Sequence, residues 1–124
     1  MSLEENKALV RAQFERVINL GELDVADATI APEYIDHAAS PGRERGPESV
    51  REFARRQRAQ YPDAHVTIED ILAESDRVAV RIVMRGTPAN GAARVAIRGM
   101  VWWRIAEGKI VERWGGTFVR EELP

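Results

Sequence analysis

The spacing of apolar residues changes abruptly at Pro62, and this change limits the folds that the chain can adopt. Before Pro62, apolar side chains recur every three to four residues, as they do on one face of a helix. After Pro62, apolar and polar side chains alternate, most clearly in RVAVRIVMR, residues 77–85. A helical first half followed by a run of strands predicts an α+β domain in which helices cover one face of a curved antiparallel sheet.

Three helical segments are expected in the first half. The first covers residues 2–21 and opens with the capping-box pattern of Ser2 and Glu5. A second, shorter helix is predicted over residues 23–30, since a proline two residues later disfavours its continuation. The third is predicted over residues 47–60, because proline suits the first turn of a helix.

One short strand is expected within the helical half, over residues 34–37, followed by a loop rich in proline and glycine over residues 38–46. The other strands are predicted over residues 66–71, 77–85, 94–104 and 109–118. Glycine-containing turns separate the last of these, which is typical of hairpin connections.

Composition excludes several classes of protein. The 124 residues include 18 Lys and Arg against 20 Asp and Glu, so a formal net charge of −2 offers no general attraction to nucleic acid or anionic lipid. The absence of cysteine excludes disulfides, thiolate nucleophiles and cysteine-ligated metals. No apolar stretch reaches the length of a membrane span, and charges within residues 1–20 disfavour a signal peptide. We expect a single cytoplasmic domain spanning residues 1–124.

A curved sheet closed by helices encloses a cone that side chains need not fill, and we expect a small apolar molecule to bind there. The large apolar candidates to line it are Phe14, Met100, Trp102, Trp103, Trp114 and Phe118. Tyr34 is a further candidate, because its hydroxyl would suit a pocket. Alternation alone leaves open which side chains of the last two strands point inward, since one bulge reverses the pattern.

Several short motifs occur in the same order as in the members of a known protein family. They are Asp36 and His37, Gly46 before its helix, Tyr61 to Asp63, Glu69 and Asp70, Asp76 to Ala79, Gly86 and Thr87, and Gly108 to Ile110 with Glu112 and Trp114. On these pieces, which span nearly the whole chain, the sequence resembles the SnoaL-like polyketide cyclases of the NTF2-like superfamily. The resemblance implies a cone-shaped α+β barrel, chemistry on enolate-like intermediates without metal or organic cofactor, and a homodimer.

The resemblance also suggests positions for catalytic groups. The cyclases carry an acid/base aspartate four residues after the tryptophan of the last strand, and here that position is Phe118. In the related ketosteroid isomerases, the general-base aspartate falls close to His37. Their oxyanion-hole tyrosine corresponds to Phe14 and their second oxyanion acid lies near Met100. The chain therefore departs from both patterns at the groups that perform the chemistry.

His37 is the predicted catalytic base, because an imidazole titrates near neutral pH and suits proton abstraction from a carbon acid. The alternative is a histidine hydrogen-bonded at the cavity rim. Asp36 is expected on the opposite face of its strand. Glu112 is either a buried acid or a residue of the sheet edge. The predicted substrate-binding residues are Phe14, Tyr34, Met100, Trp103, Trp114 and Phe118, and no metal-ligand spacing occurs.

Two functions remain open at this point. One is a cofactor-independent enzyme that acts on an apolar, cyclic or polyketide-like carbonyl compound, with His37 as base. The other is a binding or assembly module that keeps the cone and has lost the acid. His37 favours the enzyme, whereas Phe118 favours the binding module.

Overall fold

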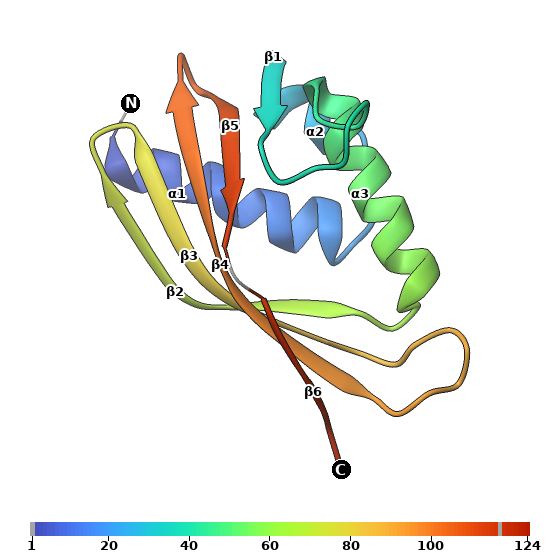
Figure 1. Cartoon of the computed structure of the whole chain (residues 1–124). Helices are drawn as coiled ribbons and strands as arrows, with labels where there is room; N and C mark the ends of the chain where they lie inside the picture. Colours follow the sequence, from blue (N-terminus) through green and yellow to red (C-terminus); the bar gives the residue numbers. More distant parts are fainter. Residues whose placement is uncertain (1, 117) are drawn as a thin grey trace.

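A computed structural model describes residues 2–116 and 118–124 of the chain (Figure 1). The helical elements are α1 (Leu3–Ala12), the π-helix η1 (Gln13–Ile18), α2 (Val25–Thr29) and α3 (Gly46–Gln60). The strands are β1 (Ile30–Asp36), β2 (His65–Glu74), β3 (Arg77–Gly86), β4 (Val95–Ala106), β5 (Lys109–Gly115) and β6 (Val119–Glu122). The α+β class predicted from the change of periodicity is confirmed.

The strands form one sheet in the order β1-β5-β4-β3-β2, with β6 also paired to β4. All of these pairs are antiparallel except β1 and β5, which run parallel, so the sheet is mixed rather than wholly antiparallel. Parallel neighbours need a long connection instead of a hairpin, and α3 with β2, β3 and β4 supplies that connection here. The turn residues that predict hairpins carry no information about the parallel pairing of β1 with β5, because these strands are far apart in the sequence.

The last predicted strand is divided in the structure. β5 pairs with Val101–Ala106 of β4, whereas β6 pairs with Val95–Arg98, so the two short strands share one long partner. Thr117, which the sequence placed inside a single strand over residues 109–118, lies outside the described residues. A Cβ on Gly116 would lie 2.5 Å from the carbonyl oxygen of Met100, and this close approach requires glycine.

The first helix begins as its sequence predicts. The Ser2 backbone N–H donates to Glu5 Oε1 at 3.0 Å, and the Glu5 N–H donates to Ser2 Oγ at 3.1 Å, which confirms the capping box. Past Ala12 the α-helix becomes the π-helix η1, where residues five apart share a face. Gln13 therefore turns toward the sheet together with Ile18, and both are buried.

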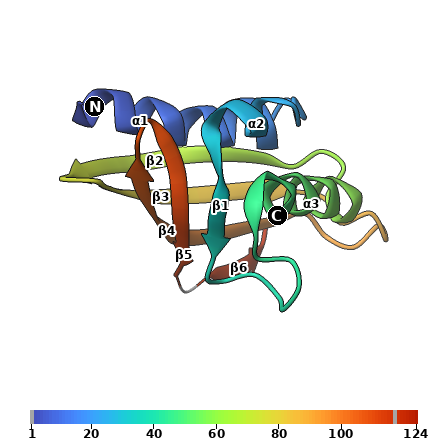
Figure 2. The same ribbon diagram turned by 90° about the horizontal axis from the view of Figure 1, so that it is seen from above.

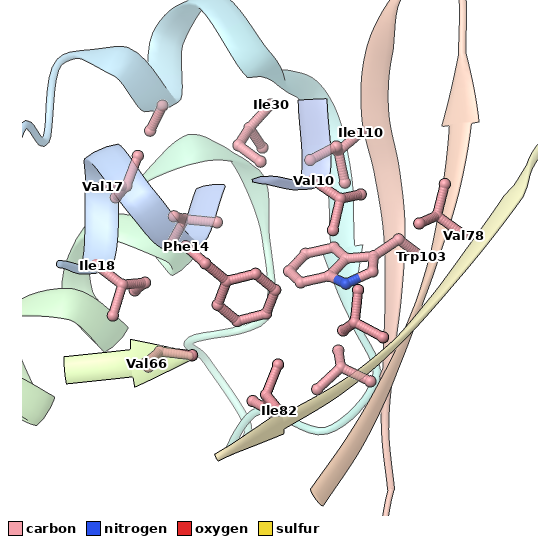
Figure 3. Close-up of a cluster of buried hydrophobic side chains, with 14 of the residues drawn as sticks. Val10, Phe14, Val17, Ile18, Ile30, Val66, Val78, Ile82, Trp103 and Ile110 are labelled. Carbon is pink, nitrogen blue, oxygen red and sulfur yellow. The ribbon is translucent and has the colours of Figure 1, made fainter. Parts of the chain in front are cut away.

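The helices cover the concave face of the sheet. In Figure 1, α1 and η1 cross the hollow formed where β2, β3 and β4 bend, and Figure 2 shows α3 near the end of the sheet that carries β6. Figure 3 shows Phe14 of η1 beside Trp103 of β4, whose ring centroids lie 5.9 Å apart with an interplanar angle of 84°. Among the described residues, no helix has the length and hydropathy that a membrane crossing requires.

Candidate functional site

A cavity of about 380 Å³ lies between the concave face of the sheet and the helices η1 and α3. Its volume falls in the range of small-molecule sites, which is about 300–1,000 Å³. Most of its wall is apolar or aromatic, as such sites require. Its polar lining residues are Gln13, Tyr34, Asp36, Ser49, Arg56, Gln57, Gln60, Tyr61 and Arg113.

Strand β1 directs Tyr34 and Asp36 into the cavity, because side chains two apart on a strand share a face. His37 follows Asp36 and lies on the other face. Asp36 is well placed for chemistry, since it is the single carboxylate among the described residues that line the cavity. Asp36 and His37 thus lie on opposite faces as predicted, but Asp36 and not His37 lines the cavity.

Asp36 forms an ion pair with Arg113 inside the cavity. Arg113 Nη1 donates to both carboxylate oxygens, at 3.1 and 3.2 Å, and the side chains are only 10% and 13% exposed. The Ala38 N–H donates a further bond of 2.9 Å to Asp36 Oδ1. The Arg113 guanidinium also lies over the ring of Trp103, 5.4 Å from its centroid. These contacts fix the carboxylate and hold a cation beside it.

A β-bulge in β5 explains why Arg113 faces inward. Arg104 of β4 pairs with Glu112, but the next residue, Ile105, pairs with Ile110, so Val111 is an extra residue. Ile110 and Arg113 therefore face the same side although they are three apart. Simple alternation from Ile110 would have turned Glu112 inward. Arg113 was missed for this reason, and we find no signal in the local sequence that marks the bulge.

Burial raises the pKa of the Tyr34 hydroxyl far above its ordinary value, and the nearby Asp36 carboxylate raises it further, while Arg113 partly offsets both effects. The phenol consequently stays protonated at any physiological pH. It can donate or accept a hydrogen bond in the cavity, but it cannot act as a phenolate base.

His37 differs from its expected position. It is absent from the cavity wall, its side chain is 40% exposed, and its Nε2 lies 2.8 Å from Glu112 Oε2. The imidazole stacks on Trp114, with centroids 5.1 Å apart and an interplanar angle of 15°. Residues 37, 112 and 114 thus meet on the convex face of the sheet, which we call the outer face.

Glu112 also lies outside the cavity. It accepts hydrogen bonds from His37 and Arg104, and these hold the pKa of its carboxyl below the ordinary value of 4.5 despite partial burial. The sequence left open a buried acid with a raised pKa at this position. The structure instead has an ionised carboxylate in an ion-pair cluster at the sheet surface.

The predicted binding residues separate between the two faces. Phe14, Tyr34, Trp103 and Phe118 line the cavity, and their role in binding stays a prediction. Met100 and Trp114 lie on the outer face instead. Met100 is 62% exposed, because alternation along β4 from the inward Trp103 places it with Trp102. Trp114 pairs directly with Trp102.

Phe118 reaches the cavity because of the glycine opposite it. A Cβ on Gly99 would lie 2.2 Å from the Phe118 ring, so the ring occupies the space that a side chain at position 99 would fill. Gly99 and Gly116 therefore both mark close approaches. At Gly99 the approaching group is an aromatic side chain of the cavity wall.

Gln13 is another polar residue of the cavity wall that was not predicted from the sequence. Its side chain is only 3% exposed, and its Oε1 has no hydrogen-bond partner among the described residues. The same holds for Nε1 of Trp103, which is 2% exposed. A signal was present in the sequence, because Gln13 lies three residues after Val10 and beside Phe14, within the apolar stripe of the first helix.

Comparison with known proteins agrees with this architecture. A sequence profile described as SnoaL-like polyketide cyclase matches residues 8–116. A search among curated proteins finds no match. Solved structures with the same fold include TsrD from Streptomyces laurentii, which is 24% identical with a TM-score of 0.82. The match covers 95% of this chain and 90% of that one.

Two further solved structures are similar over nearly their full length. A SnoaL-like polyketide cyclase from Agrobacterium tumefaciens is 19% identical with a TM-score of 0.78, and the match covers 98% of this chain and 93% of that one. IdmH, a candidate polyketide cyclase of Streptomyces antibioticus, is 26% identical with a TM-score of 0.76, covering 94% of this chain and 91% of that one.

Proposed function

Because the chain belongs to the SnoaL-like polyketide cyclase family, we propose that it is a cofactor-independent enzyme whose cavity binds an apolar, cyclic or polyketide-like carbonyl compound. The observation that carries the proposal is Asp36, a buried carboxylate on the cavity wall beside Arg113. A carboxylate held in this way can take a proton from a carbon next to a carbonyl group. Asp36 thereby replaces His37 as the base that we propose.

The proposed reaction begins with proton transfer. The bond between the α-carbon and its hydrogen breaks, the proton moves to a carboxylate oxygen of Asp36, and the electron pair moves onto the carbonyl oxygen as an enolate. Asp36 then returns the proton to the same carbon, or the enolate carbon attacks a second carbonyl of the substrate to close a ring and the protonated Asp36 gives its proton to the alkoxide oxygen that forms. Either path conserves protons and electrons without a cofactor.

Two cavity groups suit the developing negative charge. The Arg113 guanidinium has donors beyond the Nη1 that pairs with Asp36, and the protonated Tyr34 hydroxyl is a neutral donor. Most of the cavity wall is apolar, and apolar surroundings strengthen each of these interactions relative to water. The site therefore combines a base with groups able to stabilise an enolate.

Exchange of carbon-bound protons tests this proposal without knowledge of the natural substrate. We use 2-tetralone, a bicyclic ketone with acidic α-protons, and follow the loss of its α-proton NMR signals in buffered deuterium oxide. The protein is expected to accelerate exchange over buffer alone, and Asp36→Asn is expected to lower the protein-dependent rate at least about tenfold, because the amide cannot accept the proton.

His37→Gln is the matched control, since it alters the neighbouring residue on the other face of the strand. We expect its exchange rate to equal that of the wild type. Exchange that survives Asp36→Asn and disappears in His37→Gln would refute the assignment of the base and restore the one predicted from sequence.

A non-catalytic binding module is the second candidate, and Phe118 is the observation in its favour. An aromatic ring stands on the cavity wall where the resemblance to the cyclases places their acid/base aspartate. A binding module keeps affinity for bicyclic ketones without exchanging their protons. Binding of 2-tetralone with an exchange rate equal to that of buffer would favour this second function.

We also propose that two copies pair through the outer face. Leu72, Met100 and Trp102 are exposed there by 66%, 62% and 53%, and a cluster of large exposed apolar side chains is typical of interaction surfaces. Sedimentation equilibrium is expected to give twice the mass of one chain, and Trp102→Glu is expected to give one chain. A wild-type mass of a single chain would contradict the pairing.

A further inference from the structure

The cavity wall carries one more positive charge than negative charge. Its charged members among the described residues are Asp36, Arg56 and Arg113, so two arginines accompany a single carboxylate. Arg113 is already paired, since its Nη1 donates to both carboxylate oxygens of Asp36 at 3.1 and 3.2 Å. The charge of Arg56 is therefore the one that no carboxylate of the cavity wall balances, and the proposed reaction does not use it.

Helix α3 places Arg56 at the open end of the cavity. Phe53, Arg56 and Gln60 are three and four residues apart, so they share one face of the helix, and all three line the cavity. Phe53 is 40% exposed and Gln60 is also exposed, so this part of the wall meets solvent. The side chain of Arg56 is 39% exposed between them, and a molecule that enters the cavity from solvent can reach it.

The Arg56 guanidinium forms no hydrogen bond with the described residues. The one carboxylate among them within 4.0 Å is that of Glu52, whose Oε1 lies 4.0 Å from Arg56 Nε, and this separation is too long for a hydrogen bond. Glu52 is also shared, because its Oε2 lies 3.6 Å from Nη1 of Arg55. A guanidinium presents its N–H donors in a fork that matches the two oxygens of a carboxylate. Arg56 is therefore suited to bind an anionic group of a ligand.

We propose that Arg56 binds a carboxylate of the ligand at the mouth of the cavity, while the apolar body of the ligand occupies the interior. This inference rests on the proposed function, because it specifies the ligand class of the same cavity. Apolar compounds that carry a carboxylate at one end are then bound in preference to neutral compounds of the same shape. Arg56 is thereby a specificity-determining residue and takes no part in proton transfer.

A carboxylate held at the mouth also determines which end of the ligand enters first. An anion bound at Arg113 would lie beside the Asp36 carboxylate, which repels it, whereas Arg56 has no such carboxylate in contact. The side chains of Asp36 and Arg113 are also only 10% and 13% exposed, so the inner pair is the less accessible cation site. The charged end of the ligand therefore stays at the opening, and the uncharged end moves toward the base.

A matched pair of ligands tests the preference for an anion. 2-Naphthoate and 2-acetylnaphthalene have nearly the same shape, but the first carries a charged oxygen where the second carries a methyl group. Isothermal titration calorimetry at pH 7 and low salt measures both affinities. The wild type is expected to bind 2-naphthoate more tightly. Arg56→Gln is expected to lower the ratio of the two affinities about tenfold, which is the effect of one hydrogen bond between charged groups.

Two further variants of α3 separate a direct contact from the overall charge of the protein. Arg55→Gln removes the same charge from the adjacent position, which is not part of the cavity wall, and is expected to keep the wild-type ratio. Glu52→Gln removes the carboxylate that competes for Arg56, and is expected to raise the ratio about twofold. Circular dichroism checks that each variant is folded.

The outcomes distinguish this inference from the proposed function. A ratio that is unchanged in Arg56→Gln, or that falls equally in Arg55→Gln, would overturn the carboxylate site. The proposed function would then still stand on the exchange of 2-tetralone protons, since that ketone has no carboxylate. Failure of both naphthalene compounds to bind the wild type would overturn the proposed cavity function together with this inference.

Discussion

The two faces of the sheet use neighbouring residues for opposite purposes. Three adjacent pairs divide between the cavity and the outer face: Asp36 and His37, Trp103 and Trp102, and Arg113 and Glu112. Each face thus receives one ionisable residue from the C-terminal end of β1 or the position directly after it, one indole from β4 and an ion-pair partner from β5. What distinguishes the faces is burial, because helices cover one of them only.

Burial changes what a similar ion pair does. Asp36 and Arg113 are 10% and 13% exposed, whereas His37 and Glu112 are 40% and 22% exposed. A buried pair has lost most of its hydration, so either partner left alone is strongly destabilised, while an exposed pair is screened by water. The inner pair can therefore act on a ligand, and the outer pair mainly stabilises the sheet surface.

The tryptophans provide the largest expected contrast. Trp103→Ala is expected to lower the free energy of unfolding by about 4 kcal/mol, because it leaves a cavity in the core. Trp102→Ala is expected to cost less than about 1 kcal/mol at low protein concentration. Urea unfolding measures both. Equal losses would contradict the assignment of faces, and a Trp102→Ala loss that grows with protein concentration would instead report pairing of two copies.

The ion pairs provide the next contrast. Arg113→Met is expected to lower stability by about 3 kcal/mol, since it leaves the Asp36 carboxylate buried without its cation. Adding Asp36→Asn to this variant is expected to restore part of the loss, because the unpaired charge is then removed. Thermal unfolding of the single and double variants measures the effect. A double variant no more stable than Arg113→Met would contradict the buried charge.

The pH dependence of stability tests the ion pair of His37 and Glu112 on the outer face. Folding lowers the pKa of Glu112 below 4.5, so the folded state binds fewer protons, and the stabilisation is present above about pH 4.5 and lost as the pH falls through the lowered value. The stability difference between wild type and Glu112→Gln is expected to be at most about 1 kcal/mol at pH 7, after allowance for solvent screening. It should shrink in unfolding curves recorded below pH 4.5, and a difference that grows on acidification would have the wrong sign.

Met100 is expected to give the smallest effect, although the sequence made it a binding candidate. Met100→Gln alters an outer-face side chain and should change the affinity for 2-acetylnaphthalene by less than about twofold, with a stability change within about 0.5 kcal/mol. Calorimetry measures the affinity. A loss of tenfold or more would mean that residue 100 contacts the ligand.

Periodicity predicted the parts of the fold that repeat. The helices, the hairpin-linked strands and the covering of one sheet face by helices all follow from the spacing of apolar residues. Burial of one face imposes a period of about 3.6 on helices and of 2 on strands. Phe14 and Trp103 reached the cavity wall as expected. Phe14 follows the apolar spacing of the first helix, whereas alternation along β4 left open whether Trp102 or Trp103 points inward.

Single-residue irregularities account for what the sequence did not predict. The extra Val111 reverses the faces of Glu112 and Arg113, and the break near Gly116 divides the last strand in two. Such events depend on pairing with a distant strand, so a local pattern does not contain them. His37 was chosen for its chemistry, whereas the strand geometry directs its neighbour Asp36 into the cavity.

The indole signals of the three tryptophans offer the most direct test of the division between the faces. Each side chain gives one N–H correlation in a ¹⁵N NMR spectrum, assigned by substitution with phenylalanine, and 2-acetylnaphthalene is titrated into the ¹⁵N-labelled protein. The account predicts that the Trp103 signal shifts with ligand concentration while those of Trp102 and Trp114 stay in place. Shifts of Trp102 and Trp114 with an unmoved Trp103 would place the ligand on the outer face and contradict the account.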